Sequence, residues 1–161
     1  RSNQVQLLKE DIELVEVFEI IQDQLGFQAE ERNNRIEIEA DETAMVQADY
    51  DRLLQILINI TKNSIQFTEN GTIWLRGRMV GPKTVIEIED SGIGIEPAEI
   101  EKIWHRFYKA DISRTSNPFG EFGLGLSIVK QLVQMHDGKI SVKSKQGKGT
   151  KFLIEIPFRS R

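Results

Sequence analysis

Cysteine is absent from this chain of 161 residues. Its absence excludes disulfides and thiolate metal sites, and it is compatible with a reducing compartment such as the cytosol. No apolar run approaches the roughly 20 residues that a helix needs to cross a bilayer, and we find no signal peptide. An excess of basic residues is also absent: the formal net charge is -4. Charge therefore gives no indication of a nucleic-acid partner.

The composition that remains is that of an ordinary globular domain. Hydrophobic residues make up 39% and charged residues 29% of the chain, which is typical of soluble folds. The length suits one domain with a core of its own. The chain begins at Arg1 without an initiator methionine, so we expect a fragment of a longer protein. Residues 1–9 are polar and are interpreted as a tail that connects to upstream helices.

Apolar spacing and turn residues divide the remainder into helices and strands. We expect helices from Asp11, as an N-cap, to about residue 29, and over residues 49–67, 97–107 and 124–135. Strands are expected at 35–39, 45–47, 72–80, 84–89, 139–145 and 150–157, and residues 109–122 lack apolar periodicity and form a loop. Strands and helices in this mixed order predict a two-layer α/β sandwich in a single domain, residues 10–161.

The segment Asp90-Ser-Gly92-Ile-Gly94 follows a predicted strand. A carboxylate at a strand end can accept a hydrogen bond from an exocyclic amine such as that of adenine. The glycines permit positive φ and a close approach of the backbone to a flat ring. A plain surface turn is an equal alternative for this segment alone, because Asp-x-Gly is common in turns.

Two further segments carry groups suited to a nucleotide. Asn59 and Asn63 are four residues apart, so they project from one face of a helix. An amide oxygen is a suitable ligand for Mg²⁺ that also binds substrate phosphates. The run from Gly120 to Leu126 leads into a helix N-terminus, where free N–H groups attract phosphate. Solvated amides and a plain hinge are the alternatives.

In this order the segments resemble the motifs of the ATP-binding domain of bacterial two-component sensor histidine kinases, in the gyrase/Hsp90/histidine kinase/MutL superfamily. Residues 55–68 are similar to the N box, 90–94 to the G1 box, 103–108 to the F box, 123–126 to the G2 box and 147–150 to the last glycine box. The resemblance covers residues 11–158. It implies a Bergerat-type sandwich with a mixed sheet of about five strands and about three helices, and a lid over residues 109–122.

The resemblance implies that the domain binds ATP and Mg²⁺, with the metal on Asn63 and the adenine amine on Asp90. Thr150 would assist at the base through its hydroxyl or a water, and the lid would close over the phosphates. The residues that it assigns to the cofactor are Asn59, Asn63, Gln66, Asp90, Gly92, Gly94, Ile95, Arg106, Tyr108, Lys109, Gly123, Leu124, Gly125, Leu126 and Thr150.

Two places depart from the family pattern. Gln66 stands where the N box usually has a lysine that contacts phosphate, and a glutamine carries no charge. Lys62, Lys109 or Arg114 could replace that lysine. Glu121 and Phe122 make the start of the G2 segment bulkier and more negative than usual. We therefore expect weaker nucleotide binding or an unusual lid position.

The acceptor of the phosphoryl group is expected outside this chain. Asn59 occupies the position of the water-activating glutamate in the ATPase branch, and an amide cannot take up a proton. Neither His105 nor His136 has the sequence context of a phosphoacceptor, and His136 is interpreted as structural. The resemblance implies transfer to a histidine on a separate dimerisation domain of the same kinase.

The wider biology follows from the resemblance alone. A response regulator would receive the signal indirectly, the full-length protein would be a homodimer, and the fragment would be monomeric. The full protein would be anchored in the plasma membrane with this domain on the cytoplasmic side. Two other functions remain open: a degenerate nucleotide-binding module without phosphotransfer, and an anti-sigma-type serine kinase.

Overall fold

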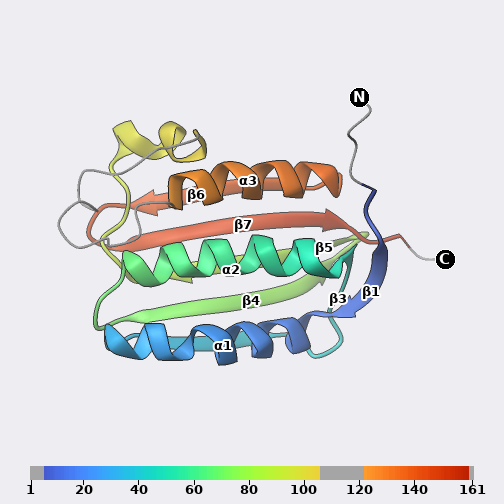
Figure 1. Ribbon diagram of the computed structural model, residues 1–161, viewed down its shortest axis with the longest axis horizontal. Coiled ribbons are helices and arrows are strands. Elements are labelled where there is room, and N and C mark those ends of the chain that lie inside the picture. Colours follow the sequence, from blue (N-terminus) through green and yellow to red (C-terminus); the bar gives the residue numbers. More distant parts are fainter. Residues whose placement is uncertain (1–5, 106–121, 160–161) are drawn as a thin grey trace.

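The computed structural model describes residues 6–105 and 122–159, with side chains in the last helix from residue 125 onward. Helices separate pairs of consecutive strands along this part of the chain (Figure 1). In chain order the elements are β1 (Lys9–Glu13), α1 (Leu14–Glu31), β2 (Arg35–Ala40), β3 (Met45–Asp49), α2 (Tyr50–Gln66), β4 (Thr72–Val80), β5 (Lys83–Asp90), the 3-10 helix η1 (Pro97–Trp104), α3 (Phe122–Met135), β6 (Lys139–Lys145) and β7 (Gly149–Pro157).

The main sheet has five strands in the order β2-β4-β5-β7-β6. The β2–β4 pair is parallel and the other neighbours are antiparallel. Helices α1, α2 and α3 lie side by side on one face of this sheet (Figure 1). The structure thus confirms the predicted two-layer α/β sandwich with a mixed sheet of five strands.

Apolar residues at helical spacing explain why these segments are helices. In α1, Leu14, Val17, Phe18, Ile21 and Leu25 are all buried against the sheet and the neighbouring helix. Successive burial at steps of three and four residues places one apolar stripe toward the core. The same spacing in α2 buries its apolar face and leaves a polar face at the side of the layer. No helix in residues 6–105 or 122–159 is long and apolar enough to cross a membrane.

The first predicted helix begins later than expected. Asp11 is not an N-cap but lies inside β1, where it pairs with Gln47 of β3 in a separate two-stranded sheet. Helix α1 begins at Leu14, whose N–H donates to the carbonyl of Ala44 at 3.1 Å. The buried side chain of Ile12 favours the strand, and this long-range pairing overrides the local capping signal.

The strands expected at 72–80 and 84–89 form a hairpin. Gly81-Pro82 joins β4 to β5, because Val80 pairs directly with Lys83. The short helix does have Pro97 in its first turn, but it is a 3-10 helix and ends at Trp104 instead of residue 107. The predicted lid over residues 109–122 falls, apart from Phe122, outside the described residues.

Candidate functional site

Asp90 is the last residue of β5 and lies between two other strands. It pairs with Ile73 of β4 and with Thr150 of β7, and only 3% of its surface is exposed. One carboxyl oxygen, Oδ1, accepts the N–H of Gly92 at 2.9 Å and the N–H of Thr150 at 3.2 Å. The fold therefore holds a buried carboxyl group at the end of the sheet in one orientation.

Burial raises the pKa of Asp90 from 3.8 to about 6. The backbone N–H groups of Gly92 and Thr150 oppose this shift, as do the hydroxyls of Ser64 and Thr68, which lower the pKa of Asp90 to a smaller extent. In the described part of the chain, neither hydroxyl has a hydrogen-bond partner at an ordinary distance and angle. The carboxyl group is thus mainly charged at pH 7, but its charge is only partly compensated by the protein.

The loop after Asp90 is braced from two sides. The N–H of Ile93 donates to the carbonyl of Phe67 at the end of α2, at 3.0 Å. From the other side, the N–H of Gly147 donates to the carbonyl of Ile93 at 2.7 Å, and the N–H of Ile95 donates to Ser144 Oγ at 2.7 Å. These bonds fix the loop between α2 and the β6–β7 hairpin.

Glycine is required in this loop for two different reasons. Gly94 has φ of +78°, and a Cβ there would collide with the carbonyl of Lys145. At Gly92 no positive φ is found, in contrast to the sequence expectation, but a Cβ would collide with the carbonyl of Phe67. Gly92 therefore serves the close contact between the loop and α2.

Several side chains in α2 and directly after it have buried oxygen atoms with no hydrogen-bond partner within the described residues. Asn63 is 4% exposed, and its Oδ1 is one of these atoms. The others, all on or directly after α2, are Thr61 Oγ1, Ser64 Oγ, Gln66 Oε1 and Thr68 Oγ1. Buried polar atoms are nearly always paired in native proteins, so this concentration indicates a place where a ligand supplies the partners.

Helix α3 approaches the same face of α2. A Cβ placed on Gly125 would lie 3.6 Å from Cγ of Asn59, at ordinary contact distance. The structure thus brings Asn59 next to the glycine-rich start of α3. The backbone of Gly123 and Leu124 lies in the first turn of this helix, and the side chain of Leu126 is buried in the core.

The C-terminal end of α2 is held by residues that the sequence analysis missed. Asn34, which is buried, donates to the carbonyls of Ile65 and Thr68 at 3.3 and 2.8 Å and accepts the N–H of Gly71 at 3.0 Å. Arg32 donates to the same two carbonyls. Helix ends leave carbonyls without intrahelical partners, so these contacts fix the end of α2 beside Asp90.

Thr150 lies beside Asp90, but its hydroxyl is hydrogen-bonded to the neighbouring strand β6. Thr150 Oγ1 lies 2.8 Å from Ser144 Oγ, and Ser144 also donates to the carbonyl of Gly149 at 3.0 Å. Ser144 was not identified from the sequence, since a serine in a strand gives no signal without its cross-strand neighbours. It joins the hairpin to the loop after Asp90.

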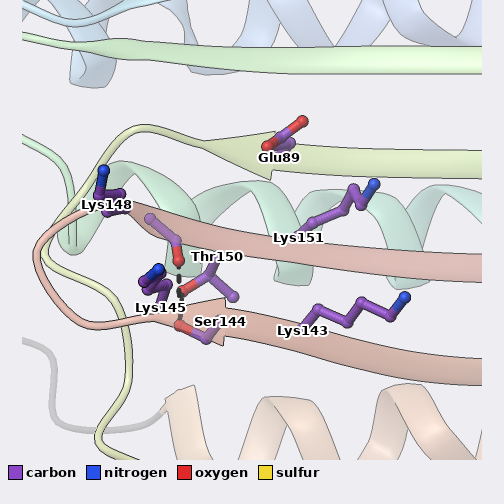
Figure 2. A pocket seen from close by; sticks show the side chains of 8 residues that line it. Glu89, Lys143, Ser144, Lys145, Lys148, Thr150 and Lys151 are labelled. Atoms are coloured by element: carbon purple, nitrogen blue, oxygen red, sulfur yellow. Dashed lines mark hydrogen bonds between the residues drawn. The ribbon is translucent and has the colours of Figure 1, made fainter.

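An open hollow of about 240 Å³ lies at this end of β6 and β7. Figure 2 shows Lys143 and Lys151 extending in the same direction from adjacent strands, with the Ser144–Thr150 hydrogen bond beside them. Because side chains alternate along a strand, these lysines lie on the opposite sheet face from Asp90 and the helices. The two lysines therefore point away from Asp90, although Ser144 and Thr150, which also line the hollow, lie on the side of the site.

The remaining predicted residues fall into three groups. Arg106, Tyr108 and Lys109 lie outside the described residues. Ile95 is buried at the end of the Asp90 loop. His136 is buried at the end of α3 and hydrogen-bonded on both ring nitrogens, which agrees with a structural role.

A divalent cation would have one suitable ligand here. No group of three or more acidic, histidine or cysteine side chains that could hold a metal occurs in the part of the chain that the structure describes. The unpartnered Oδ1 of Asn63 is a hard oxygen donor on the site face of α2, of the kind that Mg²⁺ accepts. The residues present fit a cation that is bound mainly through the oxygens of its ligand.

Comparisons with known proteins identify the family of the chain and relatives that share its fold. Residues 48–160 match the family described as histidine kinase-, DNA gyrase B-, and HSP90-like ATPase. The sensor histidine kinase YclK of Bacillus subtilis is 58% identical over 161 residues, which are 100% of this chain and 34% of YclK. The chain thus spans about a third of the length of this relative.

Solved structures share the fold. The catalytic domain of histidine kinase ThkA has a TM-score of 0.81 and 28% identity over 94% of this chain and 96% of that chain. A further structure contains ThkA in complex with the response regulator protein TrrA. Full-length ShkA in complex with AMPPNP has a TM-score of 0.86 and 25% identity over 98% of this chain and 32% of that chain.

Proposed function

The chain belongs to the family of histidine kinase-, DNA gyrase B- and HSP90-like ATPases, and we propose that it is the catalytic, ATP-binding domain of a two-component sensor histidine kinase. The 58% identity to YclK over the whole chain supports this choice within the family. The complex of ShkA with AMPPNP supports an adenine nucleotide as the ligand.

The base of the nucleotide binds at Asp90. Gly92 and Thr150 both donate to Oδ1, and we assign the other carboxyl oxygen to the exocyclic amine of adenine. A buried carboxylate whose charge is only partly compensated gains from an added N–H donor, because hydrogen bonds to charged groups are the stronger ones. The braced loop at Gly94 and Ile95 forms one side of the base site.

The phosphates bind along the polar face of α2 and the start of α3. Asn63 is the proposed ligand of Mg²⁺, and Asn59 lies beside Gly125, where backbone N–H groups of the first turn of α3 attract phosphate. Bound Mg²⁺ would neutralise phosphate charge and orient the terminal phosphate. Gln66, with an unpartnered Oε1, lies at the phosphate end, and Arg106, Tyr108 and Lys109 complete the proposed set.

The reaction is transfer of the γ-phosphoryl group to a histidine on the dimerisation domain of the same kinase. A ring nitrogen attacks the γ-phosphorus in line, the bond to the β,γ-bridging oxygen breaks, and ADP leaves with its electron pair. Asn59 has no basic group and cannot activate water. The chain therefore contributes positioning and electrostatics, and a response regulator receives the phosphoryl group afterwards, in keeping with the ThkA–TrrA complex.

The whole protein would act as a homodimer through that dimerisation domain. We place it at the plasma membrane, with this domain on the cytoplasmic side. Residues 1–9 would connect the domain to the dimerisation helices.

The observation that carries the proposal is the pair of unpartnered buried oxygens of Asn63 and Gln66 on one face of α2, together with the buried carboxyl of Asp90. Calorimetric titration with ADP, with and without Mg²⁺, tests the binding step. We expect binding that Mg²⁺ strengthens and that Asp90→Asn removes. If no heat of binding is measured at millimolar nucleotide, the proposal is contradicted and a degenerate module is favoured. This module is the second candidate because position 66 has a glutamine in place of the usual lysine.

The transfer step needs an acceptor. We would add the chain to the part of B. subtilis YclK that it does not match, together with ATP labelled on the γ-phosphate, and identify the labelled residue. The expected product is an acid-labile phosphohistidine. Label on a serine would instead support a serine kinase, and binding without any transfer would support the degenerate module.

A further inference from the structure

Asp49 connects the entering segment of the chain to the start of α2. Its Oδ1 accepts the N–H of Arg52 at 3.1 Å, so it is the N-cap of this helix. Its Oδ2 accepts the N–H of Leu8 at 2.9 Å, directly before β1. One carboxylate thus joins the segment that leads into the domain to the helix that carries Asn59 and Asn63.

The backbone of Asp49 connects the same point to α3. Its N–H donates to Nε2 of His136 at 3.1 Å, and the ring of His136 is 1% exposed. Because Nε2 accepts this bond, Nδ1 carries the proton and donates to the carbonyl of Leu132 at 2.7 Å. His136 therefore bridges the last turn of α3 and the first residue before α2.

These contacts lie at the opposite end of the two helices from the candidate site. The 14 residues from Asp49 to Asn63 correspond to about 20 Å of helix. Figure 1 shows α2 and α3 side by side, with β1 near one end and the β6–β7 turn at the other. Asn59 of α2 lies next to Gly125 of α3 toward the end near the β6–β7 turn. The distance between the two helices at this end therefore depends on how Asp49 and His136 hold them at the other end.

We propose that Asp49 and His136 form a junction that positions α2 against α3, and that the segment entering at Leu8 regulates the nucleotide site through this junction. The proposal rests on the proposed function, since it names a regulation of that same site. Asp49 and His136 are positioning residues, because they touch neither nucleotide nor metal. The simpler alternative is that His136 is only a satisfied core residue that contributes to stability.

The first test separates positioning from stability. His136→Phe keeps the ring but removes both hydrogen bonds, whereas His136→Gln can return an acceptor for the N–H of Asp49. The matched control is Gln22→Met, which removes a hydrogen bond between α1 and β2, Gln22 Nε2 to the carbonyl of Ile36 at 2.8 Å. We expect His136→Phe to weaken the affinity for Mg²⁺·ADP by about tenfold, within the usual range of coupling between sites, and His136→Gln to restore most of it.

The second test addresses the entering segment. Leu8→Pro removes the N–H that donates to Asp49, because proline has none. Leu8→Ala keeps that N–H and changes only a side chain that is largely exposed. We expect Leu8→Pro to weaken binding of Mg²⁺·ADP by about fivefold, at the low end of the same coupling range, with no change for Leu8→Ala.

Amide hydrogen exchange without nucleotide gives a readout that does not depend on the proposed function. His136→Phe should speed exchange at Asn59, Asn63 and Gly125, and Gln22→Met should not. If wild type binds ADP and the His136 and Leu8 variants bind it equally well with unchanged exchange, the junction proposal is wrong while the nucleotide site stands. If wild type binds no nucleotide, the proposed function fails, and unchanged exchange at these three amides would overturn the junction as well.

Discussion

The two ends of the candidate site differ in how far the protein satisfies its own polar groups. At the base end, Asp90 accepts two backbone N–H groups, and the loop after it is bonded to α2 and to the β6–β7 hairpin. At the phosphate end, Asn63 and Gln66 have buried oxygens without partners among the described residues. The base end is thus preorganised by hydrogen bonds within the protein. At the phosphate end, buried polar groups stay unpaired until a ligand and its cation bind.

We expect the largest change in the free energy of unfolding from a substitution that distorts the backbone at the base end of the site. Gly149 has φ of +132°, and a Cβ there would collide with the carbonyl of Asp90. Gly149→Ala should therefore lower the free energy of unfolding by at least about 3 kcal/mol in urea titrations. Gly147→Ala is the control, because its φ of +81° is unfavourable but its Cβ would meet nothing within 4 Å. It should cost about 1 kcal/mol, and equal losses for both variants would contradict this account.

A change of similar size in the free energy of unfolding is expected when Asp90 ionises. Burial raises the pKa of Asp90 from 3.8 to about 6, so between these pH values the folded protein keeps a proton that the unfolded chain has lost. The free energy of unfolding therefore falls as the pH rises through this window. Asp90→Asn cannot titrate, so its stability relative to wild type should rise by about 3 kcal/mol between pH 3.5 and 7.

Urea titrations of both proteins across this pH range provide the measurement. A difference that does not change with pH would show that the Asp90 carboxyl is not held in this environment. Because an ionised carboxyl is a stronger acceptor for the adenine amine than a neutral one, the affinity of wild type for ADP should increase as the pH rises through 6.

Two buried asparagines sharpen the comparison, because replacing them should change the stability of the protein in opposite directions. Asn63→Leu removes an unpartnered amide oxygen and should stabilise the nucleotide-free protein by about 1 kcal/mol, while it abolishes the effect of Mg²⁺ on ADP binding. Asn34→Leu leaves the N–H of Gly71 without its partner and leaves the carbonyls of Ile65 and Thr68 with Arg32 as their side-chain donor. It should destabilise by about 2 kcal/mol. Thermal unfolding with and without Mg²⁺·ADP measures both, and a loss of stability in both variants would argue against a ligand site on α2.

The smallest effect is expected far from the site. Gly26 lies in α1, and a Cβ there would meet nothing within 4 Å. Gly26→Ala should raise the free energy of unfolding by about 0.5–1 kcal/mol through helix propensity. ADP affinity should stay unchanged, and a change in affinity would mean that α1 takes part in the site.

Local patterns were sufficient to predict the layers and most elements of the fold. The alternation at residues 35–39 and the helical spacing of the apolar residues in α2 depend on near neighbours, and the structure confirms both. Asp11 was wrongly assigned as a helix cap, because its strand pairs with residues 45–49, far along the chain. A capping signal is local, and a long-range strand pair outweighs it.

The candidate site shows the same limit. Asp90 and Asn59 were identified because motif spacing indicates them, and the structure brings Asn59 to Gly125. Asn34 and Ser144 were missed, since each acts only through contacts with distant segments. The roles of Arg106, Tyr108 and Lys109 in binding phosphate stay predictions, because these residues lie outside the described part of the chain.

The most direct test of the two-ended site maps ligand contacts by NMR on isotope-labelled protein. Adenosine should shift the amide signals of residues 90–95 and Thr150 and leave those of Asn59 and Asn63 unchanged. Mg²⁺·ADP should shift both sets, together with Gly125. Adenosine shifts centred on Asn59 and Asn63, or Mg²⁺·ADP shifts that leave Asp90 unaffected, would contradict the assignment of the base to Asp90 and of the phosphates to α2.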